Sequence, residues 1–373
     1  DATLERLRDA FDLVPVRKAL RGAIPTAPVR AAYVSRRNPR LWVVDKVNGG
    51  KADALNCGLS AADYPYVAAV DADALIEEGA LLRVAQPIVD DPGVVAATGG
   101  IVRIVNGCLV DHGRVTDVRL PQSRLATLQV VEYLRAFLIG RVGWSRLNAL
   151  LIISGAFGLF RRSLVEEVGG WWTDTVGEDV ELVVRLHRHL RAEGGDYRIE
   201  FVSDPVCWTE APEDLRTLSR QRRRWHRGLA EALRRHRGAI CNPRYGTFGL
   251  VALPYFLFFE LLGPVLGAFG LPLTLLAWAL GYLSPLFLVA FLLVAILLGI
   301  LLSISALGLE ELGLRRQPGG RELARLVAYA ALENVGYRQL NDFWRVLALV
   351  DLARGRRSWG AQRRRGFRVG SPA

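Results

Sequence analysis

The 373-residue chain carries a formal net charge of +11 at pH 7, and 51% of its residues are hydrophobic. Its length allows about two domains, and its apolar residues are too concentrated in one C-terminal block for an ordinary soluble protein. The four cysteines are scattered without a C-x-x-C pair, so they are expected to be packing residues rather than disulfide partners.

Short apolar runs alternate with helical patterns through the first 200 residues. Strands are predicted at residues 40–45, 66–73, 94–104 and 150–160. Helices are predicted at residues 50–62, 77–89, 162–170 and 178–195. This alternation predicts an α/β domain with a mostly parallel sheet flanked by helices. Sheets of this kind bind ligands outside the carboxyl ends of their strands.

The segment NGGKADALN, residues 48–56, joins the first predicted strand to the first predicted helix. Gly49 and Gly50 let the backbone approach a ligand closely, and Lys51 places a positive charge at a helix start, where a phosphate can bind. The segment is not a P-loop, because it lacks the G-x-x-x-x-G-K-[ST] pattern. A plain glycine turn before a helix is the alternative interpretation.

Two carboxylates, Asp71 and Asp73, follow the apolar run YVAAV. Side chains two residues apart in an extended segment point to the same side. Two carboxylates that close repel each other unless one is protonated or a cation neutralises them. Their oxygen atoms suit Mg²⁺ or Mn²⁺. A solvated pair at a loop end is the alternative, because D-x-D alone is a weak signal.

Glu178 and Asp179 open the next helix, in the segment TVGED. The helix dipole favours an ionised carboxylate at this position, which suits a general base that accepts a proton from a sugar hydroxyl. Ordinary placement of negative charge at a helix N-terminus is the alternative. In the same helix, His187 and His189 are two residues apart and do not face each other, so they do not indicate a metal site.

Residues 211–236 predict one long helix that begins near Pro212. Within it, Gln221, Arg224 and Trp225 lie at i, i+3 and i+4 and share one face. This face suits a diphosphate beside a sugar ring, because arginine binds phosphate oxygens and tryptophan covers the apolar face of a sugar. A positive anchor before a membrane and a nucleic-acid patch are the alternatives. Nucleic-acid binding explains neither the carboxylates nor the apolar block that follows, so no nucleic-acid partner is expected.

Residues 248–308 are almost continuously apolar, which is enough for two or three membrane spans of about 20 residues each. Arginine clusters lie on both sides of this block, and positive charge near span ends marks the cytoplasmic side. We therefore expect a cytoplasmic domain at 1–238, transmembrane or interfacial helices at 239–350, and a basic cytoplasmic tail at 351–373. The helical but polar residues 321–355 form either a polar-lined span or a helix in the membrane interface.

In this order, the segments resemble those of bacterial membrane-embedded family 2 glycosyltransferases, which include the synthases of cellulose, hyaluronan and poly-β-1,6-N-acetylglucosamine. The resembling segments are GGKADALN, VDADA, EYLRAFLIGR, SGAFGLFRR, TVGEDVEL, DPVCWTE, QRRRW and ENVGYRQLNDFWR. The resemblance implies a GT-A fold at the bacterial inner membrane. It also implies inverting transfer of a sugar, N-acetylglucosamine or glucose, from a UDP-sugar to a growing polysaccharide.

The resemblance implies a role for each candidate side chain. The expected catalytic base and the expected acceptor contacts are Asp179, Glu178 and Trp225. The residues expected at the nucleotide sugar are Lys51, Asp71, Gln221 and Arg224. The expected ligands of a Mg²⁺ or Mn²⁺ ion are Asp71 and Asp73.

The N-terminal end departs from the family pattern, in which an amino-terminal span, a strand leading to P-x-x-N-E and a D-G-S-x-D motif come first. Here DATL, residues 1–4, looks like the tail of that last motif, so the first strand is expected to be missing and nucleotide binding by these 373 residues to be poor. Two alternative functions stay open: a non-processive transferase acting on a lipid carrier, and a non-catalytic membrane subunit of a polysaccharide synthase. The linkage and any accessory synthase subunits are not determined by the sequence.

Overall fold

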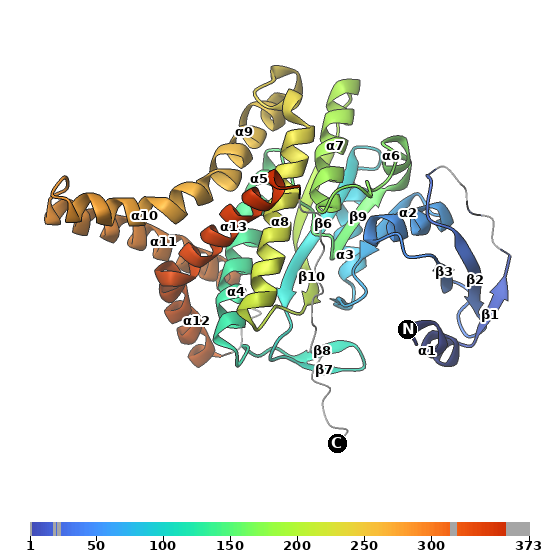
Figure 1. Cartoon of the computed structure of the whole chain (residues 1–373). Coiled ribbons are helices and arrows are strands. Elements are labelled where there is room, and N and C mark those ends of the chain that lie inside the picture. Colours follow the sequence, from blue (N-terminus) through green and yellow to red (C-terminus); the bar gives the residue numbers. More distant parts are fainter. Residues whose placement is uncertain (1, 18–19, 21–23, 314–318, 356–373) are drawn as a thin grey trace.

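The structure is a computed structural model that describes residues 2–17, 20, 24–313 and 319–355. It contains a small N-terminal sheet, a larger sheet covered by helices, and C-terminal helices of which those at residues 263–313 extend away from both sheets (Figure 1). The small sheet follows helix α1 and is antiparallel, in the order β1-β2-β3. The bounds of these elements are Thr3–Phe11 for α1, Leu13–Val16 for β1, Val29–Ser35 for β2 and Trp42–Lys46 for β3.

The larger sheet has five strands in the order β4-β9-β6-β10-β5. Their bounds are Tyr66–Val70 for β4, Phe157–Arg161 for β9, Val95–Ile104 for β6, Arg198–Thr209 for β10 and Leu75–Ile76 for β5. Within the described residues, β6 and β10 pair in parallel and the other three neighbouring pairs are antiparallel. The prediction of an α/β domain is therefore confirmed, but the prediction of a mostly parallel sheet is wrong.

Strand β9 is the main reason for the mixed sheet, because it enters between β4 and β6 and runs opposite to both. The sequence predicts one strand at 150–160, but the strand begins at Phe157 and the apolar residues before it form a largely buried loop. Ile153 of this loop fills the space beside Gly99 and Gly158. A Cβ added to those glycines would lie 3.0 and 2.6 Å from its Cγ2 atom. The apolar run thus indicates burial rather than strand pairing.

Helices cover the larger sheet and connect its strands (Figure 1). All five helices predicted before the apolar block are confirmed, with small shifts at their ends. The helices are α2 (Lys51–Ala61), α3 (Ala80–Asp90), α4 (Arg124–Leu134), the π-helix η1 (Arg135–Arg141), α5 (Val142–Arg146), α6 (Arg162–Glu167), α7 (Glu178–Glu193) and α8 (Leu215–Arg235). A hairpin of two short strands, β7 (Leu109–Asp111) and β8 (Arg114–Asp117), follows β6.

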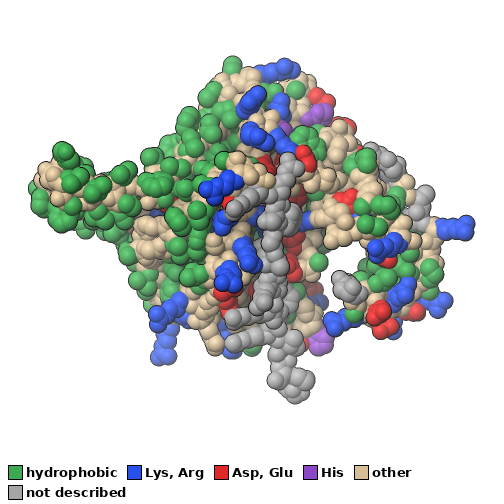
Figure 2. All heavy atoms as spheres, in the orientation of Figure 1, with side chains coloured by type: hydrophobic (Ala, Val, Ile, Leu, Met, Phe, Trp, Pro, Cys, Tyr) green, Lys and Arg blue, Asp and Glu red, His purple; other side chains and the backbone are tan. Residues whose placement is uncertain are grey.

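Two stretches, Phe248–Ala279 and Pro285–Glu311, are long and apolar enough to cross a membrane. They project as an arm whose surface is mostly hydrophobic (Figures 1 and 2). Leu266 and Leu286 on this arm are 76% and 80% exposed. Large exposed apolar patches mark surfaces that contact a membrane or another protein. The elements of this region are η2 (Arg237–Ala239), η3 (Pro243–Tyr245), η4 (Phe248–Ala252), α9 (Leu253–Tyr255), η5 (Phe256–Leu261), α10 (Gly263–Ala279) and α11 (Pro285–Gly313).

The polar C-terminal segment folds as two helices with a break between them. The elements are α12 (Gly320–Leu332), η6 (Glu333–Tyr337) and α13 (Arg338–Ala353). In the described part of the chain, neither helix is among the stretches apolar enough to span a membrane. Helix α13 packs along α8 and α10, and Arg345 pairs with Glu260 at 2.9 Å. Whether this segment lies in the membrane interface or spans the membrane stays a prediction. The predicted basic tail lies outside the described residues from residue 356 onward.

Candidate active site

Lys51 joins the separate segments of the candidate site. It begins α2 directly after Gly50, whose φ of +90° lies in the left-handed region that favours glycine. Its Nζ atom lies 2.5 Å from Oδ1 of Asp71 and 3.5 Å from Oε1 of Glu178, and it donates a hydrogen bond to the backbone oxygen of Gly155 at 3.1 Å. One ammonium group thereby connects α2, the end of β4, the loop before β9 and the start of α7.

The acidic pair Glu178 and Asp179 occupies the first turn of α7, as the sequence predicts. Glu178 is buried, and burial together with the charge of Asp179 raises its pKa, while the charges of Lys51 and Arg224 partly oppose this rise. Asp179 accepts a hydrogen bond through Oδ2 from the backbone N–H of Gly155 at 3.1 Å. The loop that binds Lys51 therefore also holds Asp179.

The first turn of α7 is fixed against α8 by two glycines and a glutamate. Gly177 and Gly228 touch through their backbones, since a Cβ added to Gly228 would lie 2.8 Å from the Cα atom of Gly177. Glu231 accepts hydrogen bonds from Oγ1 of Thr175 at 2.9 Å and from the backbone N–H of Val176 at 3.1 Å. These contacts explain why the TVGED and QRRRW segments, which are distant in sequence, lie side by side.

The three α8 residues predicted to share a face differ in their surroundings. Gln221 is buried, and its Oε1 atom makes no hydrogen bond among the described residues. Arg224 lies near enough to Glu178 for its charge to lower the pKa of that carboxyl. Trp225 is 43% exposed, and its ring centroid lies 6.3 Å from that of Tyr133. The structure thus brings Arg224 to the acidic pair and leaves part of the indole of Trp225 exposed to solvent, with the guanidinium of Arg222 4.7 Å from the ring centroid.

Asp71 and Asp73 follow the carboxyl end of β4, as predicted. Burial and the charges of these two aspartates raise the pKa of the Cys207 thiol to about 12, so both carboxylates lie near Cys207 on β10. Asp71 also pairs with Lys51 and therefore belongs directly to the cluster around α7. Asp73 follows two residues later in the sequence.

A small cavity opens beside this cluster. Its charged wall contains Lys51, Glu178 and Asp179, and its apolar wall contains Ile153 and Phe160. The cavity is therefore lined both by Lys51 of the glycine segment and by Glu178 and Asp179 of α7. The other predicted side chains do not line it: Asp71, Asp73, Gln221, Arg224 and Trp225.

Arg141, the last residue of η1, carries no role in the sequence-based prediction although it lies near the site. Its Nη1 atom is enclosed without a hydrogen-bond partner among the described residues. Burial lowers its pKa to about 10, and the nearby Asp179 carboxylate and, less strongly, the Tyr133 phenol oppose this effect. The segment EYLRAFLIGR contains it, but residue spacing in so basic a chain does not distinguish an arginine with one enclosed nitrogen from the many exposed ones.

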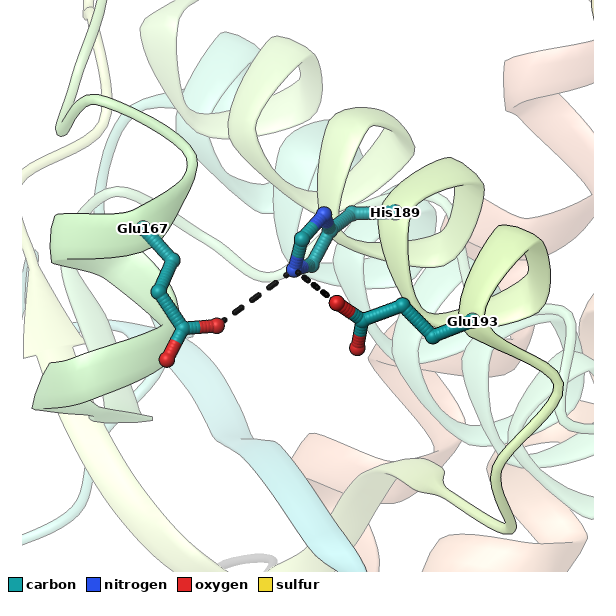
Figure 3. Close-up of side chains that lie close together, drawn as sticks. All are labelled: Glu167, His189 and Glu193. Atoms are coloured by element: carbon teal, nitrogen blue, oxygen red, sulfur yellow. Dashed lines mark hydrogen bonds and ion pairs between the residues drawn. The ribbon is translucent and has the colours of Figure 1, made fainter.

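The two histidines of α7 have different surroundings. His187 is buried and hydrogen-bonded, which indicates a structural role. His189 lies at the surface with its Nε2 atom 3.4 Å from Glu167 and 3.3 Å from Glu193 (Figure 3). These three side chains are spaced closely enough to hold a metal ion. His189 lies about 15 Å farther along α7 than Asp179, so this group is not part of the candidate active site.

Replacing Lys51 by methionine is expected to lower the melting temperature by roughly 5–10 °C at pH 8 and by less at pH 5. The pKa of Glu178 is raised, so the stability linked to this carboxyl is present below its ordinary value of 4.5 and is lost as pH rises through the folded-state value. The positive charge of Lys51 opposes this loss of stability by stabilising ionised Glu178. Lys51 stays charged between pH 5 and pH 8, because the charges of Asp71 and Glu178 raise its pKa although burial lowers it.

Melting temperatures of the wild type and of the methionine and arginine variants of Lys51, measured at pH 5 and pH 8, test this prediction. The arginine variant is the control because it keeps the positive charge. An equal drop in melting temperature at both pH values would show that the lysine does not neutralise Glu178.

Comparison with known proteins gives a family match over most of the larger sheet and the apolar arm. A family model described as glycosyl transferase family group 2 matches residues 66–304. The poly-beta-1,6-N-acetyl-D-glucosamine synthase of Staphylococcus aureus (strain COL) is 35% identical over 204 residues, and that of Staphylococcus epidermidis is 34% identical over 206 residues. Each match covers 54% of this chain and 44% of the relative, so the chain spans about half the length of the curated relatives it matches.

One solved structure that matches this chain is the mannosyltransferase PcManGT from Pyrobaculum calidifontis in complex with GDP-Man and Mn²⁺. It is 21% identical to this chain with a TM-score of 0.47, and the match covers 84% of this chain and 70% of that one.

Proposed function

Because the chain belongs to glycosyl transferase family group 2, we propose that it transfers a sugar from a UDP-sugar to the end of a growing polysaccharide, with inversion at the anomeric carbon. N-acetylglucosamine is favoured over glucose as the sugar, because the curated relatives are named as synthases of poly-N-acetylglucosamine. The observation that carries the proposal is the position of Lys51 between Asp71 and Glu178, beside Asp179. This cluster joins the expected nucleotide side of the site to its expected acceptor side.

Asp179 is the proposed general base. The acceptor hydroxyl gives its proton to this carboxylate, and its oxygen forms a bond to the anomeric carbon of the donor sugar. The bond from that carbon to the diphosphate oxygen breaks, and its electron pair leaves with the diphosphate. Glu178 and Trp225 are proposed to face the acceptor, with the exposed indole of Trp225 as a stacking surface for a sugar ring.

Positive side chains are proposed to hold the departing diphosphate. Negative charge develops on this group as the bond breaks, so fixed cations near it lower the barrier. Lys51 and Arg224 both lie close enough to Glu178 for their charges to lower its pKa, and this supports their proposed role. An arginine can also bind two phosphate oxygens at once. Gln221, one turn earlier on α8, is proposed to support this contact.

Asp71 and Asp73 are proposed to bind a divalent cation, Mg²⁺ or Mn²⁺. Mg²⁺ in proteins is usually held by one or two carboxylates together with substrate phosphates. One oxygen of Asp71 pairs with Lys51, so the other oxygen of the same carboxylate is available for a metal. Oxygen ligands therefore fit this ion, which when bound would neutralise negative charge on the diphosphate.

We also propose that the protein lies in the bacterial inner membrane with its catalytic domain, residues 1–238, in the cytoplasm. Residues 239–350 form the membrane and interfacial helices, and the basic tail 351–373 returns to the cytoplasm. The two apolar stretches of the arm and the arginine-rich α8 beside it support this arrangement.

The proposed activity is tested by incubating membranes that contain the protein with a panel of UDP-sugars and Mg²⁺ or Mn²⁺. One sugar is expected to give UDP release and a lengthening polymer. EDTA is expected to lower the rate by about 100-fold, and added metal to restore it. Asp73→Asn should raise the metal concentration needed for half-maximal rate by about 10-fold, whereas the exposed control Glu78→Gln should not.

Each outcome of this assay addresses a different part of the proposal. A single glycolipid instead of a polymer would contradict polysaccharide synthesis. Full activity in EDTA would contradict the metal. No UDP release with any UDP-sugar would contradict the transferase itself.

A further inference from the structure

A strip of side chains on one continuous helix connects the proposed acceptor surface to the proposed base. Helix α4 continues into η1 without a break, and Tyr133, Phe137 and Arg141 follow one another at intervals of four residues. The ring of Tyr133 lies 6.3 Å from that of Trp225 and 5.9 Å from that of Phe137. The guanidinium carbon of Arg141 lies 3.8 Å from the centroid of Phe137. At the far end of the strip, the charge of Asp179 acts on Arg141.

The guanidinium group of Arg141 is fixed in place by its neighbours. Phe137 is buried, and its ring also lies 5.9 Å from that of Phe201 on β10, so the surface under the guanidinium is anchored in the core. A planar guanidinium stacked on such a ring is held in one orientation before any ligand arrives. The segment that carries Arg141 is a π-helix, a form that recurs at functional sites.

Arg141 also has unused hydrogen-bonding capacity. Its Nη1 atom is enclosed and makes no hydrogen bond, including to Asp179, among the described residues. The other described arginines with an enclosed, unpaired nitrogen have only Nε in this state. An enclosed N–H group without an acceptor is unfavourable, and other atoms of the same side chain or backbone are partly exposed to solvent.

We propose that Arg141 binds the terminal sugar of the acceptor by donating a hydrogen bond from Nη1 to an oxygen of that sugar. The sugar ring then rests on Trp225, and its reactive hydroxyl faces Asp179. This inference rests on the proposed function and adds an acceptor contact to it. An acceptor is favoured over the diphosphate as the ligand because Arg141 belongs to the strip that reaches Trp225, whereas the diphosphate side contains Lys51 and Arg224.

The test combines truncation with chemical rescue in membranes that contain the protein. Arg141→Ala is expected to lower kcat/KM for a β-1,6-linked N-acetylglucosamine oligosaccharide by about 100-fold, with the KM for the UDP-sugar unchanged. Guanidinium at millimolar concentration should restore part of the rate, because it fills the space of the missing group, whereas neutral urea should not. Arg146→Ala, which removes an exposed arginine one turn farther along, is the matched control.

A second measurement separates this inference from the proposed function. Binding of the same oligosaccharide is followed by the fluorescence of the tryptophans. Arg141→Ala should weaken this binding. Arg141→Lys should weaken it by about 10-fold, because lysine keeps the charge but not the planar group. If the wild type transfers no sugar but binds the oligosaccharide through Arg141, the proposed function fails and this inference holds. The inference about Arg141 would be overturned if Arg141→Ala and Arg141→Lys bound the oligosaccharide and turned over like the wild type. It would also be overturned if the variants lost donor and acceptor affinity equally and guanidinium restored no activity.

Discussion

Replacing Asp179 by asparagine is expected to lower kcat for sugar transfer by about 1,000-fold. The amide cannot accept the proton of the acceptor hydroxyl, yet it has nearly the same shape and can still accept the hydrogen bond that the backbone N–H of Gly155 gives to Asp179. Binding of the UDP-sugar should therefore change by no more than about threefold. Single-turnover transfer and equilibrium binding of the UDP-sugar measure the two quantities separately.

The matched control is Glu193→Gln, at the opposite, exposed end of the same helix. It removes one negative charge from α7 without touching the cavity, so kcat should stay at the wild-type value. If Asp179→Asn retained more than about a tenth of the wild-type kcat, the loss would be smaller than removal of a general base produces. Glu178 would then be the next candidate for the base, because it lines the same cavity.

The part of the site that could be predicted from sequence lies at the ends of helices and strands. Apolar periodicity places the end of β4 and the starts of α2 and α7, and Lys51, Asp71 and Glu178 stand at those points. The structure brings these three side chains into contact. The chemical roles of these side chains stay predictions. Their contact is observed, and it arises because the ends of strands and helices in α/β layers lie together at one edge of the sheet.

The part that could not be predicted depends on partners distant in sequence. Whether β9 runs parallel or antiparallel to β4 and β6 depends on where the chain returns to the sheet, and composition does not encode that. The loop around Ile153 is apolar because it is buried, so it carries the same signal as a strand. Arg141 also could not be singled out from the sequence, because the enclosure of its Nη1 atom depends on side chains that pack around it in the folded structure.

Replacing Gly228 by valine is expected to lower kcat by at least about 100-fold and to destabilise the protein. A side chain at this position meets the backbone of Gly177, since even a Cβ would lie 2.8 Å from its Cα and 3.1 Å from its nitrogen. Overpacking of this kind costs about 1–3 kcal/mol. The backbone that must move is the residue directly before the acidic pair, and a shift of about 1 Å in a reacting group can lower the rate by about 100-fold.

A graded series separates the effect on the site from the effect on stability. Gly228→Ala should lower kcat and the melting temperature less than valine does. The control Gly238→Ala, where an added Cβ meets nothing within 4 Å, should change neither. Glu231→Gln keeps the backbone contact but weakens the hydrogen bonds to Thr175 and Val176, so it should lower kcat without overpacking. If Gly228→Ala lowered the melting temperature but left kcat intact, the glycine contact would support the fold without positioning Asp179.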